Sequence, residues 1–81
     1  MEDKTMFYDV SKLQDELIKA TLKEVIEALE ERGYNPINQI VGYLISGDPG
    51  YISNYKDARM KMLSLDRSEV VKLILEKFIK E

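Results

Sequence analysis

Length, composition and charge limit this chain to a few classes of protein. It has 81 residues, of which 44% are hydrophobic and 33% are charged, so we expect a single folded domain with a small core. The net charge of −3 argues against a general attraction to nucleic acid, and the absence of cysteine and histidine removes disulfides, thiol nucleophiles and the commonest metal ligands.

The first ten residues differ from the rest of the chain. They are polar at first, then carry the apolar group MFY, and they show no helical period. We interpret residues 1–10 as a flexible arm and residues 11–81 as one helical domain. Ser11 and Gln14 match the capping box, in which two side chains satisfy backbone N–H groups at a helix start. The first helix is therefore predicted to begin at Ser11.

The first helix is predicted to be amphipathic and to end near residue 32. Gly33 follows the last periodic residue, where a left-handed backbone favours glycine, and Tyr34 is placed to pack back on Leu29. The predicted core face consists of Ile18, Leu22, Val25 and Leu29, widened by Leu17 and Ile26.

A second helix is predicted from Asn35 and Pro36, an N-cap followed by a proline in the first turn. Gly47 is predicted to end it. The interior Gly42 should cost helix stability, which suggests that another helix approaches closely at that point. The apolar residues recur at helical spacing and predict a buried face of Ile37, Ile40, Val41, Leu44 and Ile45.

Asp48 and Pro49 repeat the cap-then-proline pattern and predict a tight corner. A third helix is then expected from Ser53 or Asn54 to about residue 64, with an inward face of Tyr55, Ala58 and Met62.

The last helix has a complete start signal. Asp66 is the predicted cap and Glu69 the third helical residue, with Leu65 and Val70 as a hydrophobic staple. Its predicted buried face is Val70 or Val71, Ile74, Leu75, Phe78 and Ile79. No strand pattern competes with these helices, so the fold class is an all-α bundle of four to five helices.

The glycines and prolines all fall in the run RGYNPINQIVGYLISGDPGYI, which raises the question of a phosphate-binding loop. Their spacing matches neither the P-loop nor the dinucleotide fingerprint. The acidic residues Glu27, Glu30 and Glu31 are typical of a solvated helix face rather than a catalytic pair. We therefore expect no enzymatic activity, cofactor or metal. Apolar residues also come only in short runs, so we expect no membrane span and no signal peptide, and hence a cytoplasmic protein.

Two features remain as candidate functional residues. Lys56, Arg59 and Lys61 form a small basic cluster, which fits either a nucleic-acid-binding helical module or an anion-recognising patch for an acidic or phosphorylated partner; Asp57 and the net charge favour the protein partner. Thr5 is the one serine or threonine within the predicted arm. Phosphate there would add nearly two negative charges beside an apolar anchor.

The run RGYNPINQIVGYLISGDPGYI, followed by KDAR and preceded by TMFYD in the arm, resembles the IreB family of small bacterial regulatory phosphoproteins. The resemblance is nearly continuous and covers most of the chain. The family pattern at mid-chain corresponds here to Gly33, Tyr34, Asn35, Pro36, Asn38, Gln39, Gly42, Gly47, Asp48 and Pro49.

The resemblance implies an all-helical, cytoplasmic homodimer without enzymatic activity. It implies that a PASTA-domain Ser/Thr kinase phosphorylates Thr5 and that a phosphatase reverses this. It further implies that the unmodified form promotes degradation, by the Clp protease, of the enolpyruvyl transferase that commits UDP-N-acetylglucosamine to peptidoglycan. Phosphorylation would then raise wall synthesis and cephalosporin tolerance.

The chain departs from the family pattern in its basic residues. An arginine of the family is replaced by Asn54, and a following pair of arginines is replaced by Leu63 and Ser64, whereas Arg59 is retained. The resemblance implies that Arg59, with Lys56 and Lys61, contacts a protein partner.

Overall fold

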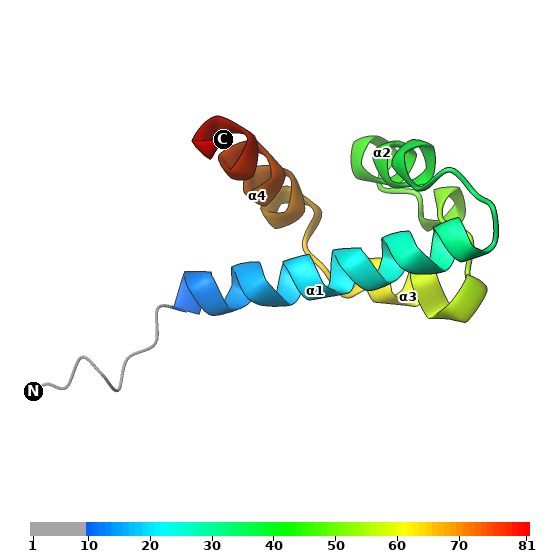
Figure 1. Ribbon diagram of the computed structural model, residues 1–81. Helices are drawn as coiled ribbons and strands as arrows, with labels where there is room; N and C mark the ends of the chain where they lie inside the picture. The colour runs from blue at the N-terminus through cyan, green and yellow to red at the C-terminus, as the bar shows by residue number, and fades with distance from the viewer. Residues whose placement is uncertain (1–9) are drawn as a thin grey trace, which may run out of the picture.

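A long helix forms the spine of the protein, and the shorter helices pack along it (Figure 1). The computed structural model describes residues 10–81, and Thr5 lies outside this range. Within the described part all regular structure is helical, which confirms the predicted all-α class. The elements are α1 (Val10–Glu31), α2 (Pro36–Ser46), the 3₁₀ turns η1 (Pro49–Tyr51) and η2 (Tyr55–Asp57), α3 (Ala58–Leu63) and α4 (Arg67–Lys80).

The start of α1 differs slightly from the sequence prediction. The helix begins at Val10, so Ser11 lies inside it and the predicted capping box at Ser11 is wrong. A helix boundary is set by backbone dihedral angles, so one pair of side chains that matches a capping motif does not fix it.

The end of α1 has the predicted geometry. Gly33 has a φ of 84°, in the left-handed region where glycine carries no steric penalty. Its N–H donates to the Glu30 carbonyl at 2.9 Å, and the Tyr34 N–H donates to the Leu29 carbonyl at 2.9 Å. This pair of bonds is the Schellman motif, which satisfies carbonyls that a helix end leaves unpaired.

Both ends of α2 also form as predicted. The Asn35 side chain accepts a hydrogen bond from the Asn38 N–H at 3.1 Å, and Pro36 occupies the first turn. At the other end Gly47 has a φ of 77°, and its N–H donates to the Tyr43 carbonyl at 2.7 Å. Local residue types therefore set the limits of this helix.

Gly42 has a different role from the predicted one. The aromatic ring that covers it belongs to Tyr51 of η1, not to another helix. A Cβ at position 42 would lie 2.4 Å from Tyr51 Cδ1, far inside van der Waals contact. The glycine therefore allows the corner after α2 to fold back against the helix.

The segment between α2 and α3 corrects a second prediction. Neither Ser53 nor Asn54 caps α3, which begins only at Ala58 after the separate turn η2. The Ser53 N–H donates to Gln39 Oε1 at 2.9 Å, and Gln39 Nε2 donates to Ser53 Oγ at 3.2 Å. These two hydrogen bonds hold residues 52–54, which connect η1 to η2, against α2.

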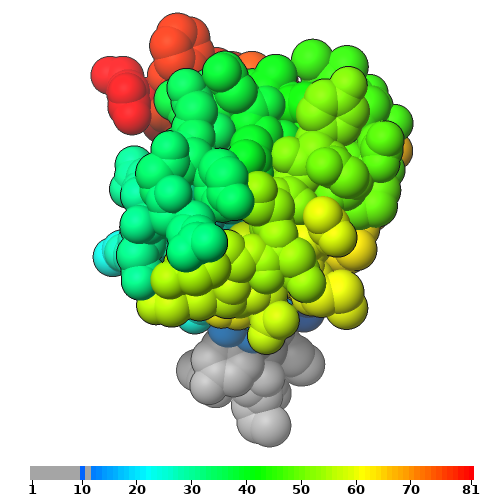
Figure 2. All heavy atoms as spheres, turned by 90° about the vertical axis from the view of Figure 1, so that its right-hand side faces the viewer, coloured from blue at the N-terminus to red at the C-terminus, as the bar shows by residue number. Residues whose placement is uncertain are grey.

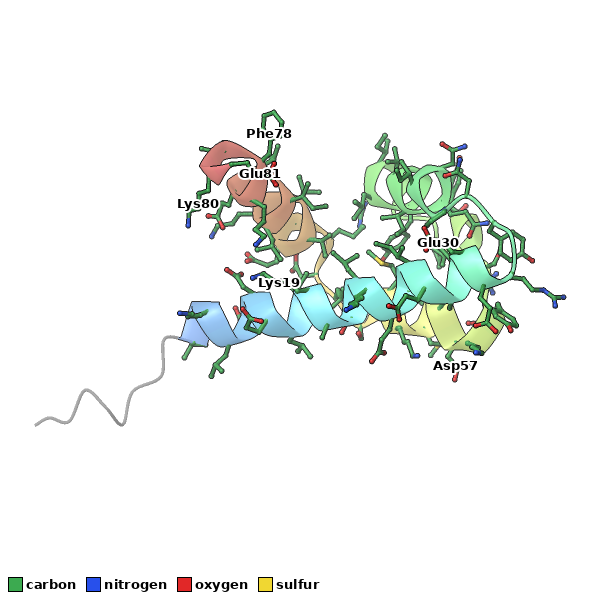
Figure 3. All side chains as sticks on the ribbon, viewed as in Figure 1. Lys19, Glu30, Asp57, Phe78, Lys80 and Glu81 are labelled. Carbon is green, nitrogen blue, oxygen red and sulfur yellow. The ribbon has the colours of Figure 1, made fainter. Side chains whose placement is uncertain are left out.

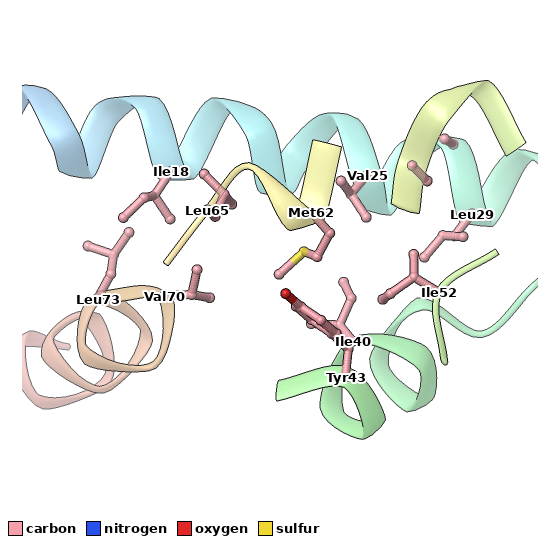
Figure 4. Packing of buried hydrophobic residues seen from close by; sticks show 12 residues of the cluster. Ile18, Val25, Leu29, Ile40, Tyr43, Ile52, Met62, Leu65, Val70 and Leu73 are labelled. Atoms are coloured by element: carbon pink, nitrogen blue, oxygen red, sulfur yellow. The ribbon is translucent and has the colours of Figure 1, made fainter. Parts of the chain in front are cut away.

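The core lies between α1 and the other helices (Figure 4). Most of the residues predicted to be buried on α1 and α3 are buried, Leu22, Ile26 and Tyr55 are partly buried, and Val70 and Leu65 join them as the predicted staple. Asp66 caps α4 by accepting from the Glu69 N–H at 3.2 Å. The buried set is Ile18, Val25, Ala28, Leu29, Ile40, Tyr43, Ile52, Ala58, Met62, Leu65, Val70 and Leu73.

Several residues predicted to be buried are exposed in the single chain. On α2 the core-facing residues are Ile40 and Tyr43, and on α4 they are Val70 and Leu73. These helices therefore present a narrower face to the core than their apolar spacing predicts, and the remaining apolar residues point elsewhere. Of the alternatives Val70 and Val71, Val70 is the buried one, and the wrongly predicted residues are Leu17, Ile37, Val41, Ile45, Ile74, Leu75, Phe78 and Ile79.

Candidate functional site

The turn η2 carries the unusual backbone of the structure. Lys56 and Asp57 have φ values of 52° and 62°, the two positive-φ residues other than glycine among residues 10–81. A left-handed conformation costs roughly 1–2 kcal/mol for a residue with a Cβ, and less for aspartate than for lysine. Contacts around the turn must offset this cost.

Glu31, the last residue of α1, provides these contacts. Its carboxylate accepts a hydrogen bond from Lys56 Nζ at 2.8 Å and one from the Tyr55 hydroxyl at 3.0 Å. The Lys56 hydrogen bond, and secondarily that of Tyr55, lowers the pKa of Glu31 below its ordinary value, and the Glu31 hydrogen bond raises the pKa of Lys56. Both side chains are more than a third exposed, so solvent screens the pair and its main effect is to position the turn.

The other two cations of the predicted basic cluster are also engaged. Lys61 Nζ lies 3.4 Å from a carboxylate oxygen of Glu24, and Arg59 Nε donates to the Ile52 carbonyl at 2.9 Å. Arg59 is half-buried, and its bond fixes the chain after the corner at η1. Two of the three predicted cations, Lys56 and Lys61, are thus paired with glutamates of α1, and Arg59 is bonded to the backbone.

Arg32 and Tyr55 form a contact that the sequence did not indicate. The Arg32 guanidinium lies over the Tyr55 ring, 5.3 Å from its centroid, and Lys56 Nζ lies 5.7 Å from the same centroid. Arg32 is exposed, and within residues 10–81 no hydrogen bond or ion pair joins its side chain to another residue, although its backbone N–H donates to the Ala28 carbonyl at 3.3 Å. Because Arg32 and Tyr55 are 23 positions apart, only the return of the chain to the end of α1 brings them together.

These residues lie at one end of the molecule. The end of α1 and the segment from η1 to α3 form one continuous face, which Figure 2 views directly. Asp57 projects from the outer edge of this end, as Figure 3 shows. We call the set Arg32, Tyr55, Lys56, Asp57 and Arg59 the end face.

A second candidate surface is an apolar groove. Helices α2 and α4 lie on the same side of α1 (Figure 1), with a groove of about 900 Å³ between the three. Phe78 points away from α1 and is 75% exposed (Figure 3). The apolar residues that line the groove are Leu22, Ile26, Ile37, Ile40, Val41, Leu44 and Ile74.

The glycine- and proline-rich run has structural roles. Helices α1 and α2 are terminated by Gly33 and Gly47. The elements that follow are capped by Asn35 and Asp48, and Gln39 bonds to Ser53 in the connection between η1 and η2. Nothing in this run between residues 32 and 52 brings together a nucleophile and a base. Across the described chain no group of three or more acidic, histidine or cysteine residues is placed to hold a metal ion.

Among residues 10–81, no helix is both long and apolar enough to cross a membrane. In a comparison with protein families, residues 3–80 match the family described as IreB regulatory phosphoprotein. The match includes Thr5 in its range and covers nearly the whole chain.

Proposed function

The chain belongs to the IreB family of regulatory phosphoproteins, and from this membership we propose that it is a non-enzymatic, cytoplasmic regulator that is switched by phosphorylation of Thr5. The observation that carries the proposal is the family match over nearly the full length. A PASTA-domain Ser/Thr kinase is the proposed modifying enzyme, and a phosphatase resets the switch.

The choice of Thr5 is supported by the state of the other hydroxyl residues near it. Ser11 and Thr21 lie within α1, where their backbone groups belong to a hydrogen-bonded helix. A kinase binds its substrate as an accessible segment, and phosphate adds nearly two negative charges at pH 7. The expected result is that the cognate kinase labels Thr5 in the intact protein, as mapped by mass spectrometry. Labelling confined to Ser11 or Thr21 would contradict the assignment.

The proposed output is control of cell-wall synthesis. The unmodified protein promotes Clp-dependent degradation of the enolpyruvyl transferase that commits UDP-N-acetylglucosamine to peptidoglycan, and phosphorylation relieves this. Wall synthesis and cephalosporin tolerance then rise. The end face is the proposed contact for the protein partner, because Lys56 and Arg59 lie there with an exposed arginine and a tyrosine, which are residue types enriched in protein interfaces.

We also propose that the protein is a homodimer. Helix α4 is attached to the body through Val70 and Leu73, while Val71, Ile74, Leu75 and Phe78 form an uncovered stripe at helical spacing. A chain of 81 residues buries a smaller fraction of its surface on folding than a larger domain does, so covering this stripe with a second copy adds stability that one copy lacks.

The alternative of a nucleic-acid-binding module has less support. A phosphate-binding patch needs cations that are free to neutralise the backbone. Lys56 and Lys61 are each paired with a glutamate of α1 instead. Such a module would show salt-sensitive retention of DNA or RNA in a gel shift, which the regulatory proposal does not expect.

A further inference from the structure

The end face contains one cation that its surroundings leave without a counter-charge. Glu31 accepts from both Lys56 and Tyr55, at 2.8 Å and 3.0 Å, so this carboxylate is already engaged. Arg32 is held over the Tyr55 ring at 5.3 Å and makes no ion pair with another residue between 10 and 81. Its charge therefore remains available at the surface.

The arrangement prepares Arg32 for binding. The Tyr55 ring is oriented by the hydrogen bond from its hydroxyl to Glu31, and it provides a flat surface for the guanidinium. A cation–π contact with the ring does not use up the N–H donors of the guanidinium, which match the two oxygens of a carboxylate. Less side-chain freedom is then lost on binding than for an unsupported arginine.

The backbone beneath Tyr55 gives an independent reason to look here for function. Lys56 and Asp57 adopt left-handed conformations that are unfavourable for residues with a Cβ, and such strain concentrates at binding and switch sites. The turn places Tyr55 and Lys56 against the end of α1. A relaxed turn would not be expected to hold the ring under Arg32.

The anion is not the phosphate of the same chain. Residues 10–32 span about 33 Å along α1 at 1.5 Å per residue. The five residues from Thr5 to Val10 reach at most about 18 Å when fully extended. A phosphate on Thr5 therefore cannot contact Arg32 within one copy.

We propose that Arg32, held over the Tyr55 ring, binds a carboxylate of an acidic segment on a protein partner. This inference rests on the proposed function, because it names the chemistry of the partner that contacts the end face. Tyr55 is a positioning residue in this site, and Lys56 contributes long-range attraction while it remains paired with Glu31.

The test is a titration of the ¹⁵N-labelled, full-length protein with hexaglutamate, followed by NMR. The expected result is saturable shifts of the Arg32 Nε–Hε signal and of the Tyr55 and Lys56 amides. The variant Arg32→Ala should bind about tenfold more weakly, as expected for loss of one charge-assisted pair. Arg32→Lys should recover part of the affinity, and Lys12→Ala, at the opposite end of α1, should leave it unchanged.

Three outcomes would overturn the inference: no binding of hexaglutamate, equal binding by Arg32→Ala and the wild type, or shifts spread over all exposed lysines. Tighter binding of inorganic phosphate at the same signals would also overturn it, since the site would then prefer phosphate to carboxylate. Circular dichroism of each variant separates loss of binding from loss of fold. Kinase labelling of Thr5 does not depend on Arg32, so failure here leaves the proposed function to be judged separately.

Discussion

Because the Tyr51 ring covers Gly42, the effect of Gly42→Ala on stability should depend on whether residue 51 is tyrosine or alanine. In an ordinary helix interior, Gly→Ala stabilises by about 1 kcal/mol because alanine restricts the unfolded chain and favours the helix. At position 42 the new Cβ would lie 2.4 Å from Tyr51 Cδ1 and 2.9 Å from Cγ. Contact at Cγ cannot be relieved by moving only the far end of the ring.

The expected magnitude follows from two opposing effects. Displacing a packed ring costs about 1–3 kcal/mol, as for other insertions into filled space, against a helix gain of about 1 kcal/mol. Gly42→Ala should therefore destabilise the wild type by about 0–2 kcal/mol. In a Tyr51→Ala background the clash is absent, and the same substitution should stabilise by about 1 kcal/mol. The coupling between the two positions is then about 1–3 kcal/mol.

The assay is urea unfolding of the wild type, the two single variants and the double variant, at one protein concentration because self-association would shift the apparent stability. An unchanged dependence on urea would show that the variants unfold from comparable structures. Equal effects of Gly42→Ala in both backgrounds would refute the reasoning, because the Tyr51 ring would then not cover Gly42 in solution.

Two further predictions concern the apolar face and the ion pair. Ile74→Lys, which places a charge in the uncovered stripe of α4, should convert a dimer to monomer in sedimentation at micromolar concentration, whereas Lys72→Ala beside it should not; a wild type that sediments only as monomer would contradict the homodimer. Glu31 should titrate below its ordinary pKa of 4.5 in NMR and return toward it in Lys56→Met. Because the pKa of Glu31 is lowered in the folded protein, its pair with Lys56 stabilises the fold above pH 4.5, and this stabilisation is lost as the pH falls through the folded-state pKa. An unchanged titration of Glu31 in Lys56→Met would rule out the pair as the cause of the lowered pKa.

The candidate site could be predicted only in part. Lys56, Arg59 and Lys61 stand out in the sequence as a basic cluster, and the family resemblance drew attention to Arg59. Their partners in the fold did not stand out, because Glu31 is 25 positions from Lys56 and belongs to a different helix. Arg32 carries no local signal at all. A chemical site assembled across such separations depends on how the chain returns to the end of α1.

The sequence by itself determined the end of α1, both ends of α2 and the start of α4. The Schellman exit at Gly33, the cap at Asn35, the exit at Gly47 and the cap at Asp66 all rest on interactions within five residues, so residue type and order specify them. These local contacts exist whatever the helices later pack against.

Only the tertiary structure decided which apolar faces the chain covers. The spacing on α2 and α4 marks residues such as Val41 and Ile74 as apolar but does not say what lies opposite them, and in the single chain both are exposed. The structure also decided that Gly42 meets a tyrosine ring and that Arg32 meets Tyr55. Burial and stacking depend on the relative positions of whole helices, and these are set by the packing of the shared core.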